Sequence, residues 1–398
     1  MNKQAVTRAP SRGLMLLGIL AIATVLRVTF TSIAPLLDDI RTVFQLSTAQ
    51  TGFLTTLPLL AFAVVSPLAA RLARGLGIER SLLVALIAVG IGIGLRSAGT
   101  ENMLWLGTLI IGCGIALGNV LLPALIKRDF ADRVARITGA YSLTMGIAAA
   151  IGSALMVPVA AHGGWQQALL VLLFFPLAAL LLWLPQVRRH IPAGVASANL
   201  AQGRGLWRSS LAWQVTLFLG LNSLVYYVVI GWLPSILVSN GFSPEHAGSL
   251  HGLLQLATAA PGLFIGVVLA RLNDQRAIAA ATALLSAISM LGLWLAPALA
   301  PVWVTLFGFG AGATMILGLT FIGLRASSAH QAAALSGMAQ SIGYLLAAFG
   351  PPLIGKLHDI SGHWSIPLGT IVLFSLVMAG FGVGAGRNRE IDTIKHRP

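Results

Sequence analysis

The chain has 398 residues, of which 57% are hydrophobic and only 9% are charged. A soluble protein carries about 25% charged residues, so most of this protein's surface must face lipid. The only cysteine, Cys113, lies in an apolar run, which excludes a disulfide framework and a thiol metal site. The net charge of +14 raises the possibility of nucleic-acid binding, but the distribution of the basic residues argues against it, as shown below.

The first apolar run follows Lys3, Arg8 and Arg12 and extends from residue 14 to Pro35. This start resembles a signal peptide. However, the run is longer than the apolar region of such a peptide, and many further runs follow. We therefore expect an uncleaved first membrane helix. One residue inside it, Arg27, is of a type that lipid-embedded helices avoid.

Twelve apolar runs are long enough to cross about 30 Å of hydrocarbon. They lie at 14–35, 50–70, 78–98, 102–125, 138–160, 166–186, 212–235, 248–270, 276–297, 302–325, 332–355 and 366–386. The sequence therefore predicts an all-α membrane protein with twelve transmembrane helices. A six-helix half at 1–186 and a second at 212–398 are joined by a basic cytoplasmic linker at 187–211.

Lysine and arginine collect in cytoplasmic loops, so their distribution predicts the orientation. With a cytoplasmic N-terminus, 21 of the 25 Lys and Arg residues fall in cytoplasmic segments. Arg41, Arg96 and Lys356 fall outside, and Arg27 lies in a span. We expect both termini to be cytoplasmic. The excess of Lys and Arg in the cytoplasmic segments of a protein embedded in the lipid bilayer then accounts for the high net charge, without nucleic acid as a partner.

The two halves resemble each other at an offset of about 198 residues. Pro35 corresponds to Pro234, each expected to end the first helix of its half, and Trp165 corresponds to Trp364, each expected to anchor at the membrane interface. Further matches are Ala70-Arg71-Leu72 with Ala270-Arg271-Leu272, and Gly139 with Gly337. Two halves of equal orientation are parallel repeats, which in transporters bind substrate between them at mid-membrane.

Segments in almost every predicted helix resemble the major facilitator superfamily, and within it the branch of cyanate permeases and 2-nitroimidazole transporters of bacterial inner membranes. Among them are LRVTFTSIAPLLDDIR, GIALGNVLLPALIKRDF and FIGLRASSAHQAAALSGMAQSIGYLLAAFGPP. The resemblance implies a heteroaromatic compound or a small anion as cargo. The chain departs from the superfamily's loop after the second helix, where Ala70 and Arg74 stand in place of the usual Gly and Asp. The latch between halves that this acid forms must be absent or replaced, with Glu79 as a candidate.

Arg27 is the strongest candidate for substrate binding. A charge at a helix centre costs about 2.5–3.5 kcal/mol on insertion scales, and Arg27 lies about 20 Å into a helix that starts at Leu14. Thr24, Arg27 and Thr31 share one helix face. The guanidinium either faces a central cavity, where its planar fork suits a two-oxygen acceptor, or reaches outward to water or to backbone carbonyls.

Polar side chains in other spans are weaker candidates for the same site. Each also has a packing interpretation, because lone polar groups commonly bond between membrane helices. The candidates are Asn119, Asn222, Tyr226, Gln255, Gln340 and Tyr344, together with Thr31. Tyr141 is weaker still, and Tyr227 is expected to pack away from the site.

His251 is the only histidine inside a predicted span, and all eleven acidic residues fall in loops or at termini. Because proton relays in transporters use such intramembrane groups, His251 is the candidate for proton coupling. Its place one turn from the outer boundary also allows a solvated or structural role.

These features predict a secondary transporter of a small polar or anionic solute that works by alternating access. The family resemblance favours export of 2-nitroimidazole-type compounds, with cyanate or another small anion as the alternative. No nucleophile–base pairing, nucleotide loop or metal cluster is evident in the sequence, so neither an enzyme nor a cofactor is expected. A membrane receptor that does not transport is a further alternative. It would bind the solute without flux.

Overall fold

The computed structural model describes residues 12–130, 133–188, 206–327 and 329–391, and within these ranges the regular structure is helical. The N-terminal half is built from α1 (Arg12–Thr31), η1 (Ala34–Leu36), α2 (Leu37–Phe44), α3 (Thr48–Leu76), α4 (Ile78–Arg96), α5 (Glu101–Asp129), α6 (Val134–Val171), α7 (Phe174–Trp183) and η2 (Leu184–Arg188).

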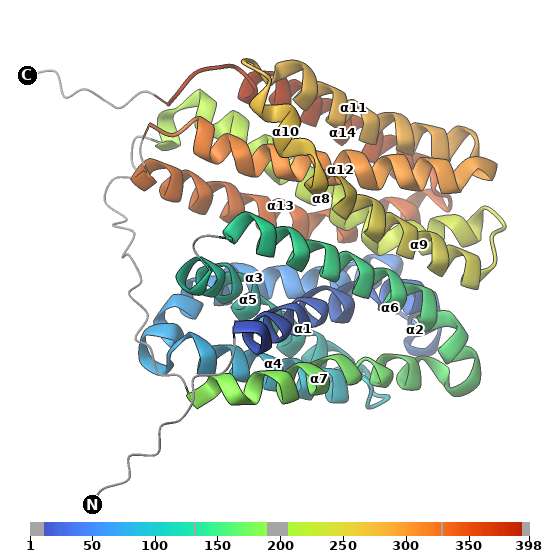
Figure 1. The fold of residues 1–398 in the computed structure, drawn as a ribbon. Coiled ribbons are helices and arrows are strands. Elements are labelled where there is room, and N and C mark those ends of the chain that lie inside the picture. Colours follow the sequence, from blue (N-terminus) through green and yellow to red (C-terminus); the bar gives the residue numbers. More distant parts are fainter. Residues whose placement is uncertain (1–11, 131–132, 189–205, 328, 392–398) are drawn as a thin grey trace, which may run out of the picture.

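The C-terminal half is built from α8 (Ser210–Ser239), α9 (Pro244–Ala259), η4 (Ala260–Leu263), α10 (Ile265–Ala270), α11 (Arg276–Leu295), η5 (Pro297–Leu299), α12 (Ala300–Leu324), α13 (Ala329–Ser361) and α14 (Ser365–Ala385). Figure 1 shows the two halves as two stacked groups of helices, with α6 and α13 lying where the groups meet.

Within the described residues, nine apolar helical segments are long enough to cross a membrane. One of them, Ile137–Val187, contains two predicted spans, because α6 runs on through a break at Gly164, where φ is 75°. The predicted spans at 248–270 and 332–355 correspond to α9–α10, which a 3-10 turn interrupts, and to α13. All twelve predicted crossings are thus helical. Most of the linker lies outside the described residues, so its boundaries stay a prediction.

Pro234 does not end its helix as expected. It lies inside α8, which continues to Ser239, whereas α1 does stop before Pro35. A proline inside a helix frees the carbonyl four residues earlier, which here belongs to Ile230. His251 Nε2 lies 3.0 Å from that carbonyl oxygen and donates to it. The neighbouring helix α9 thus supplies a donor to the carbonyl that Pro234 leaves without one.

Two other sequence-based expectations are also wrong. Trp165 and Trp364 are buried instead of anchoring at the interface, since each packs edge-on or tilted against another ring, Phe44 and Trp232 respectively. Arg96, at the end of α4, is 1% exposed and donates to the Thr29 carbonyl at the end of α1, at 3.0 Å.

Glu79 does not link the two halves. Its carboxylate forms an ion pair with Arg128, which joins the start of α4 to the end of α5 within the N-terminal half. The equivalent place in the C-terminal half is held by Arg325, which donates to Gln275 and to the Ala385 carbonyl. In each half, therefore, one arginine ties the ends of neighbouring helices together. We call this contact the arginine clamp.

The halves touch closely at one end of the bundle, which we call the outer end. It is the end opposite to the basic loops that follow α3 and α5. A Cβ at Gly52 of α3 would lie 2.6 Å from the Pro351 carbonyl oxygen of α13, and one at Gly252 of α9 would lie 2.8 Å from the Ala150 carbonyl oxygen of α6. The α3–α13 and α6–α9 seams therefore close the outer end by direct backbone contact.

Candidate substrate-binding cavity

A cavity of about 590 Å³ lies between the halves. The side chains that line it come from α1, α3, α5 and α6 on one side and from α8, α12 and α13 on the other. Its lining extends toward the basic end of the bundle, to Pro123 of α5, Tyr141 of α6 and Gly337 of α13. The cavity therefore approaches the basic end, and the two glycine-rich seams close the outer end above it.

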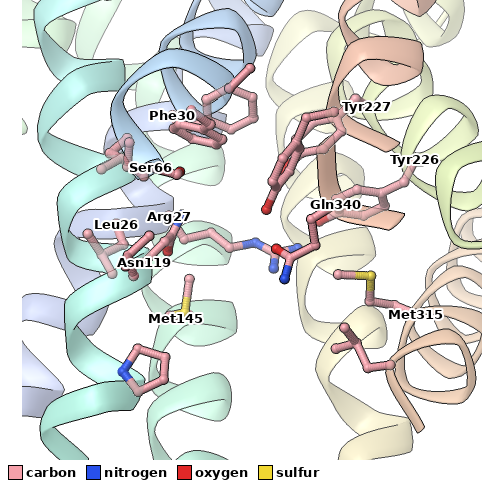
Figure 2. Close-up of a pocket in the computed structure, with 18 of the residues that line it drawn as sticks. Leu26, Arg27, Phe30, Ser66, Asn119, Met145, Tyr226, Tyr227, Met315 and Gln340 are labelled. Atoms are coloured by element: carbon pink, nitrogen blue, oxygen red, sulfur yellow. The ribbon is translucent and has the colours of Figure 1, made fainter. Parts of the chain in front are cut away.

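Arg27 reaches from α1 across this cavity to the opposite half. Figure 2 shows its guanidinium pointing toward Gln340, Tyr226 and Tyr227 on the facing helices. Its Nε and Nη2 both donate to the side-chain oxygen of Gln255 on α9, at 3.3 and 3.0 Å, and Nη2 lies 3.4 Å from Thr258 Oγ1. Of the two alternatives, the structure therefore has the guanidinium at the cavity and not reaching outward to water. A membrane-embedded cation is instead held by neutral oxygens from the other half.

Tyr226 belongs to the same cluster. Its hydroxyl donates to the Gln255 oxygen at 3.2 Å, and its ring centroid lies 5.3 Å from Arg27 Cζ. A cation over an aromatic face is attracted by the ring quadrupole. The Arg27 charge is therefore offset in part without any carboxylate.

All four tyrosines of the chain line this one cavity: Tyr141, Tyr226, Tyr227 and Tyr344. Tyr227 packs edge-on against Phe30, and Tyr344 packs edge-on against Phe62, with centroid separations of 5.5 and 5.7 Å. Arg27 is the one charged residue among the lining residues, which include no acid. The cavity thus presents aromatic faces, several hydroxyl groups and a single positive charge.

Most of the candidate residues meet at this cavity. Thr31, Asn119, Tyr226, Gln340 and Tyr344 line it, and Gln255 contacts Arg27 at its border. Gln340 is exposed to the cavity and donates to Ser336 of its own helix at 3.1 Å. The Thr31 hydroxyl donates to the Arg27 carbonyl, so it shapes α1 as well as lining the site.

Asn222 lies elsewhere. It is 3% exposed and does not line the cavity, although its helix contributes Tyr226, Tyr227 and Ile230 to the lining. Its Oδ1 is buried without a hydrogen-bond partner. The expectation that Asn222 faces the cavity is therefore wrong. Matching helix depth between repeats does not fix the rotation of a side chain about the helix axis.

His251 lies in the protein interior, which fits the structural alternative and not the solvated one. Its side chain is 0% exposed, does not line the cavity and bonds the Ile230 carbonyl freed by Pro234. Since a carbonyl only accepts, Nε2 carries a proton, and Nδ1 is buried without a partner. A role of His251 in proton coupling stays a prediction.

Sequence reasoning missed Tyr227 as a lining residue and gave Tyr141 little weight. The tyrosine count was the available signal: only four occur, all within predicted spans. Adjacent residues on a helix diverge by about 100°, so Tyr226 and Tyr227 were expected on different sides. The cavity is wide enough for both rings to border it.

A cavity between two six-helix halves, closed at one end by their contact, defines a membrane transporter. The family model for the Major Facilitator Superfamily matches residues 19–351, and the chain belongs to this family. It is 65% identical over 382 residues to the 2-nitroimidazole transporter of Escherichia coli (strain K12), covering 96% of this chain and 97% of that one.

Two more distant relatives and one solved structure agree with this family. The chain is 43% identical to the uncharacterized transporter YycB of Bacillus subtilis (strain 168), over 95% of this chain and 94% of that one. It is 27% identical to the cyanate transport protein CynX of Escherichia coli (strain K12), over 88% and 91%. The fold matches an inward-facing, unoccupied bacterial homologue of the human lysosomal transporter Spinster, with a TM-score of 0.76 at 16% identity, over 95% and 98% of the two chains.

Proposed function

We propose that this transporter carries flat heteroaromatic compounds that bear a polarised oxygen group, of the 2-nitroimidazole type, out of the bacterial cell across the inner membrane. The observation that carries the proposal is Arg27, the one charge in a cavity lined by four tyrosines. The 65% identity to a 2-nitroimidazole transporter supports the same substrate class.

The chemistry of the lining fits this cargo. A nitro group presents two oxygens that match the guanidinium fork, and an aromatic ring stacks on or edges against tyrosine rings. A lipophilic cation fits poorly, because the Arg27 charge repels it and the lining residues include no carboxylate to hold it. Binding here therefore selects electron-rich or anionic compounds.

The distribution of basic residues supports the proposed orientation, with both termini and the basic end of the bundle in the cytoplasm. The cavity extends toward that end while the outer end is closed, which fits a state in which an exporter loads substrate from inside. Rocking of the halves about the central site then releases substrate outside. The sequence-based candidate for proton coupling, His251, is tested by the pH profile of transport in His251→Gln.

A second candidate cargo is a small anion such as cyanate. The observation that favours it is the guanidinium itself, which has no acidic partner within hydrogen-bonding distance among the residues that the structure describes, and the relation to CynX points the same way. Cyanate has no ring, so tyrosine faces contribute little to its binding. The two cargoes are therefore separable by removing the aromatic contacts.

Ligand binding to the purified transporter in detergent tests both candidates. Thermal shift and calorimetry are run with 2-nitroimidazole and with cyanate, on the wild type, Arg27→Ala, Arg27→Lys and Tyr226→Leu. We expect Arg27→Ala to weaken binding by about 10–100-fold, as for loss of a charged hydrogen bond, and Arg27→Lys to weaken it nearly as much. Tyr226→Leu weakens only the aromatic ligand. Equal affinity of the wild type and Arg27→Ala would contradict the assignment of the site.

A further inference from the structure

The hydrogen bonds of Arg27 connect the two halves of the transporter at the closed end of the cavity. Arg27 belongs to α1 of the N-terminal half, whereas its partners Gln255 and Thr258 belong to α9 of the C-terminal half. We call this set of bonds the Arg27 bridge. In the described residues, the other side-chain hydrogen bonds between the halves are those from Thr48 and Ala49 to Asp359, at the outer end.

The Arg27 bridge uses the atoms that a two-oxygen ligand needs. A guanidinium holds a carboxylate or nitro group bidentately along one of two edges, Nε with Nη2 or Nη1 with Nη2. Nη2 belongs to both edges, and both of its contacts run to α9: 3.0 Å to Gln255 Oε1 and 3.4 Å to Thr258 Oγ1. Any bidentate ligand must therefore displace one of these partners.

Gln255 is the stronger of the two partners. Its Oε1 accepts from Nε and Nη2 of Arg27 and also from the Tyr226 hydroxyl, while its Nε2 is buried without a partner. The side chain is 0% exposed. A buried amide with an unsatisfied Nε2 is costly. The burial of Gln255 is explained if its oxygen accepts the Arg27 hydrogen bonds when no substrate is bound.

We propose that, without substrate, the Gln255 side-chain oxygen occupies the position at Arg27 that an oxygen of the substrate takes when substrate is bound. Substrate that takes this position breaks the Arg27 bridge. The proposal rests on the proposed function, because it requires a ligand with an acceptor oxygen at Arg27. Without substrate, the bridge helps to keep the outer end closed. Substrate loaded from the basic end removes one cross-half attachment and thereby favours opening to the outside.

The need to displace the Gln255 oxygen also limits which compounds can bind at Arg27. A ligand must outcompete a neutral amide oxygen that is already in place and held by two N–H groups and one hydroxyl. A carboxylate does so by its charge. A nitro group is a weaker acceptor and needs additional contact with the surrounding tyrosine rings. Polar solutes without either property leave the Arg27 bridge intact.

The test combines substrate affinity with exposure of the outer seam. Ser153 lies at the α6–α9 seam and is 0% exposed, and the backbone oxygen of this residue faces Gly248. Ser153→Cys, in a Cys113→Ser background, is labelled by a membrane-impermeant maleimide from outside only when this seam opens. Two variants change the acceptor. Gln255→Leu removes the acceptor oxygen, and Gln255→Glu replaces the neutral amide oxygen with a charged carboxylate. Gln214→Leu and Gln214→Glu are the matched controls, on α8 away from the cavity lining.

We expect 2-nitroimidazole to raise labelling of the otherwise wild-type protein. Gln255→Leu raises labelling without substrate and binds 2-nitroimidazole about three- to tenfold more tightly, because no bond must be broken. Gln255→Glu lowers labelling and weakens binding at least tenfold. The Gln214 variants match the wild type. Weaker binding by Gln255→Leu would overturn the proposal and make Gln255 an ordinary ligand, as would unchanged labelling in the absence of substrate.

The ligand-free labelling separates this proposal from the proposed function. If the wild type binds no 2-nitroimidazole, the proposed cargo is wrong, but Gln255→Leu still opens the seam when the Arg27 bridge is real. If the wild type binds 2-nitroimidazole and Gln255→Leu leaves both affinity and labelling unchanged, the proposed cargo is supported and the proposed role of Gln255 is wrong.

Discussion

Arg27 owes its unusual place to groups that the sequence keeps far apart. Its partner Gln255 lies 228 residues away, and the Tyr226 ring that covers it belongs to another helix of the same distant half. Neutral oxygens and an aromatic face hold the guanidinium without neutralising it. The positive charge therefore remains available to a ligand, which an intramolecular carboxylate would prevent.

His251 provides a test at the scale of one residue. Its N–H group satisfies the Ile230 carbonyl that Pro234 leaves without a donor, so we expect a structural role. His251→Phe leaves that carbonyl unpaired and lowers stability by about 1–3 kcal/mol, measured as thermal unfolding in detergent. His251→Gln retains a donor and keeps the pH profile of transport. A flattened pH profile in His251→Gln would instead establish His251 as a proton carrier.

The sequence predicted which residue types form the site better than it predicted their orientations. Arg27 stands out because a charge in an apolar span is costly, and the polar candidates Asn119, Gln340 and Tyr344 do line the cavity. Asn222 and Tyr227 were placed incorrectly. Nearly all positions in these spans are apolar, so helical periodicity carries little information about which face of each helix meets the cavity.

At the scale of helices, the outer closure depends on glycine. A methyl group at Gly52 would lie 2.6 Å from the Pro351 carbonyl oxygen, whereas one at Gly380 of α14 would meet nothing within 4 Å. We expect Gly52→Ala to force α3 and α13 apart and to increase maleimide labelling of Ser153→Cys. Gly380→Ala is the matched control and should be neutral or stabilising, since alanine favours helix. Equal labelling of the two variants would show that the seam tolerates the methyl group.

Asp359 is a second outer contact, because its carboxylate accepts from the Thr48 and Ala49 N–H groups at the start of α3, at 3.2 and 3.1 Å. Loss of such a cap costs about 1 kcal/mol, so we expect Asp359→Ala to shift the halves toward outward opening by about fivefold. Spin-label distances between the halves measure this shift. An unchanged distance distribution in Asp359→Ala would show that the contact is not part of the closure.

The pH dependence of this contact follows from the same bonds. Burial raises the pKa of Asp359, but the hydrogen bonds from Thr48 and Ala49 outweigh burial and bring the pKa below its ordinary value of 3.8. A carboxylate with a lowered pKa stabilises the closed state above its ordinary pKa and loses this effect only as the pH falls through the lowered value. The Asp359 contribution to closure should therefore be constant between about pH 5 and 8.

The sequence predicted the helical elements well and their ends less well. Long apolar runs mark the crossings because hydrocarbon allows little else. Helix ends depend on tertiary contacts instead. Pro234 was expected to end α8 because the sequence does not show that His251 replaces its lost donor. Arg96 caps the Thr29 carbonyl at the end of α1, a contact that the sequence does not show.

At the scale of the whole molecule, the two halves have equivalent scaffolds and different central residues. Each has an arginine clamp at its basic end, Arg128 in one and Arg325 in the other. At the cavity, however, the N-terminal half provides the cation, and the C-terminal half provides Tyr226 and its acceptor Gln255. The features that the two halves share thus form the scaffold that rocks during transport, whereas substrate recognition depends on the cavity residues in which the halves differ.

The central claim is that Arg27 binds the transported compound. The most direct test is flux of radiolabelled 2-nitroimidazole in proteoliposomes that contain equal amounts of wild type, Arg27→Gln or Gln214→Leu, each verified as folded by its thermal unfolding. We predict flux by the wild type and Gln214→Leu, and flux at the protein-free background for Arg27→Gln. Transport by Arg27→Gln at the wild-type rate would contradict the claim.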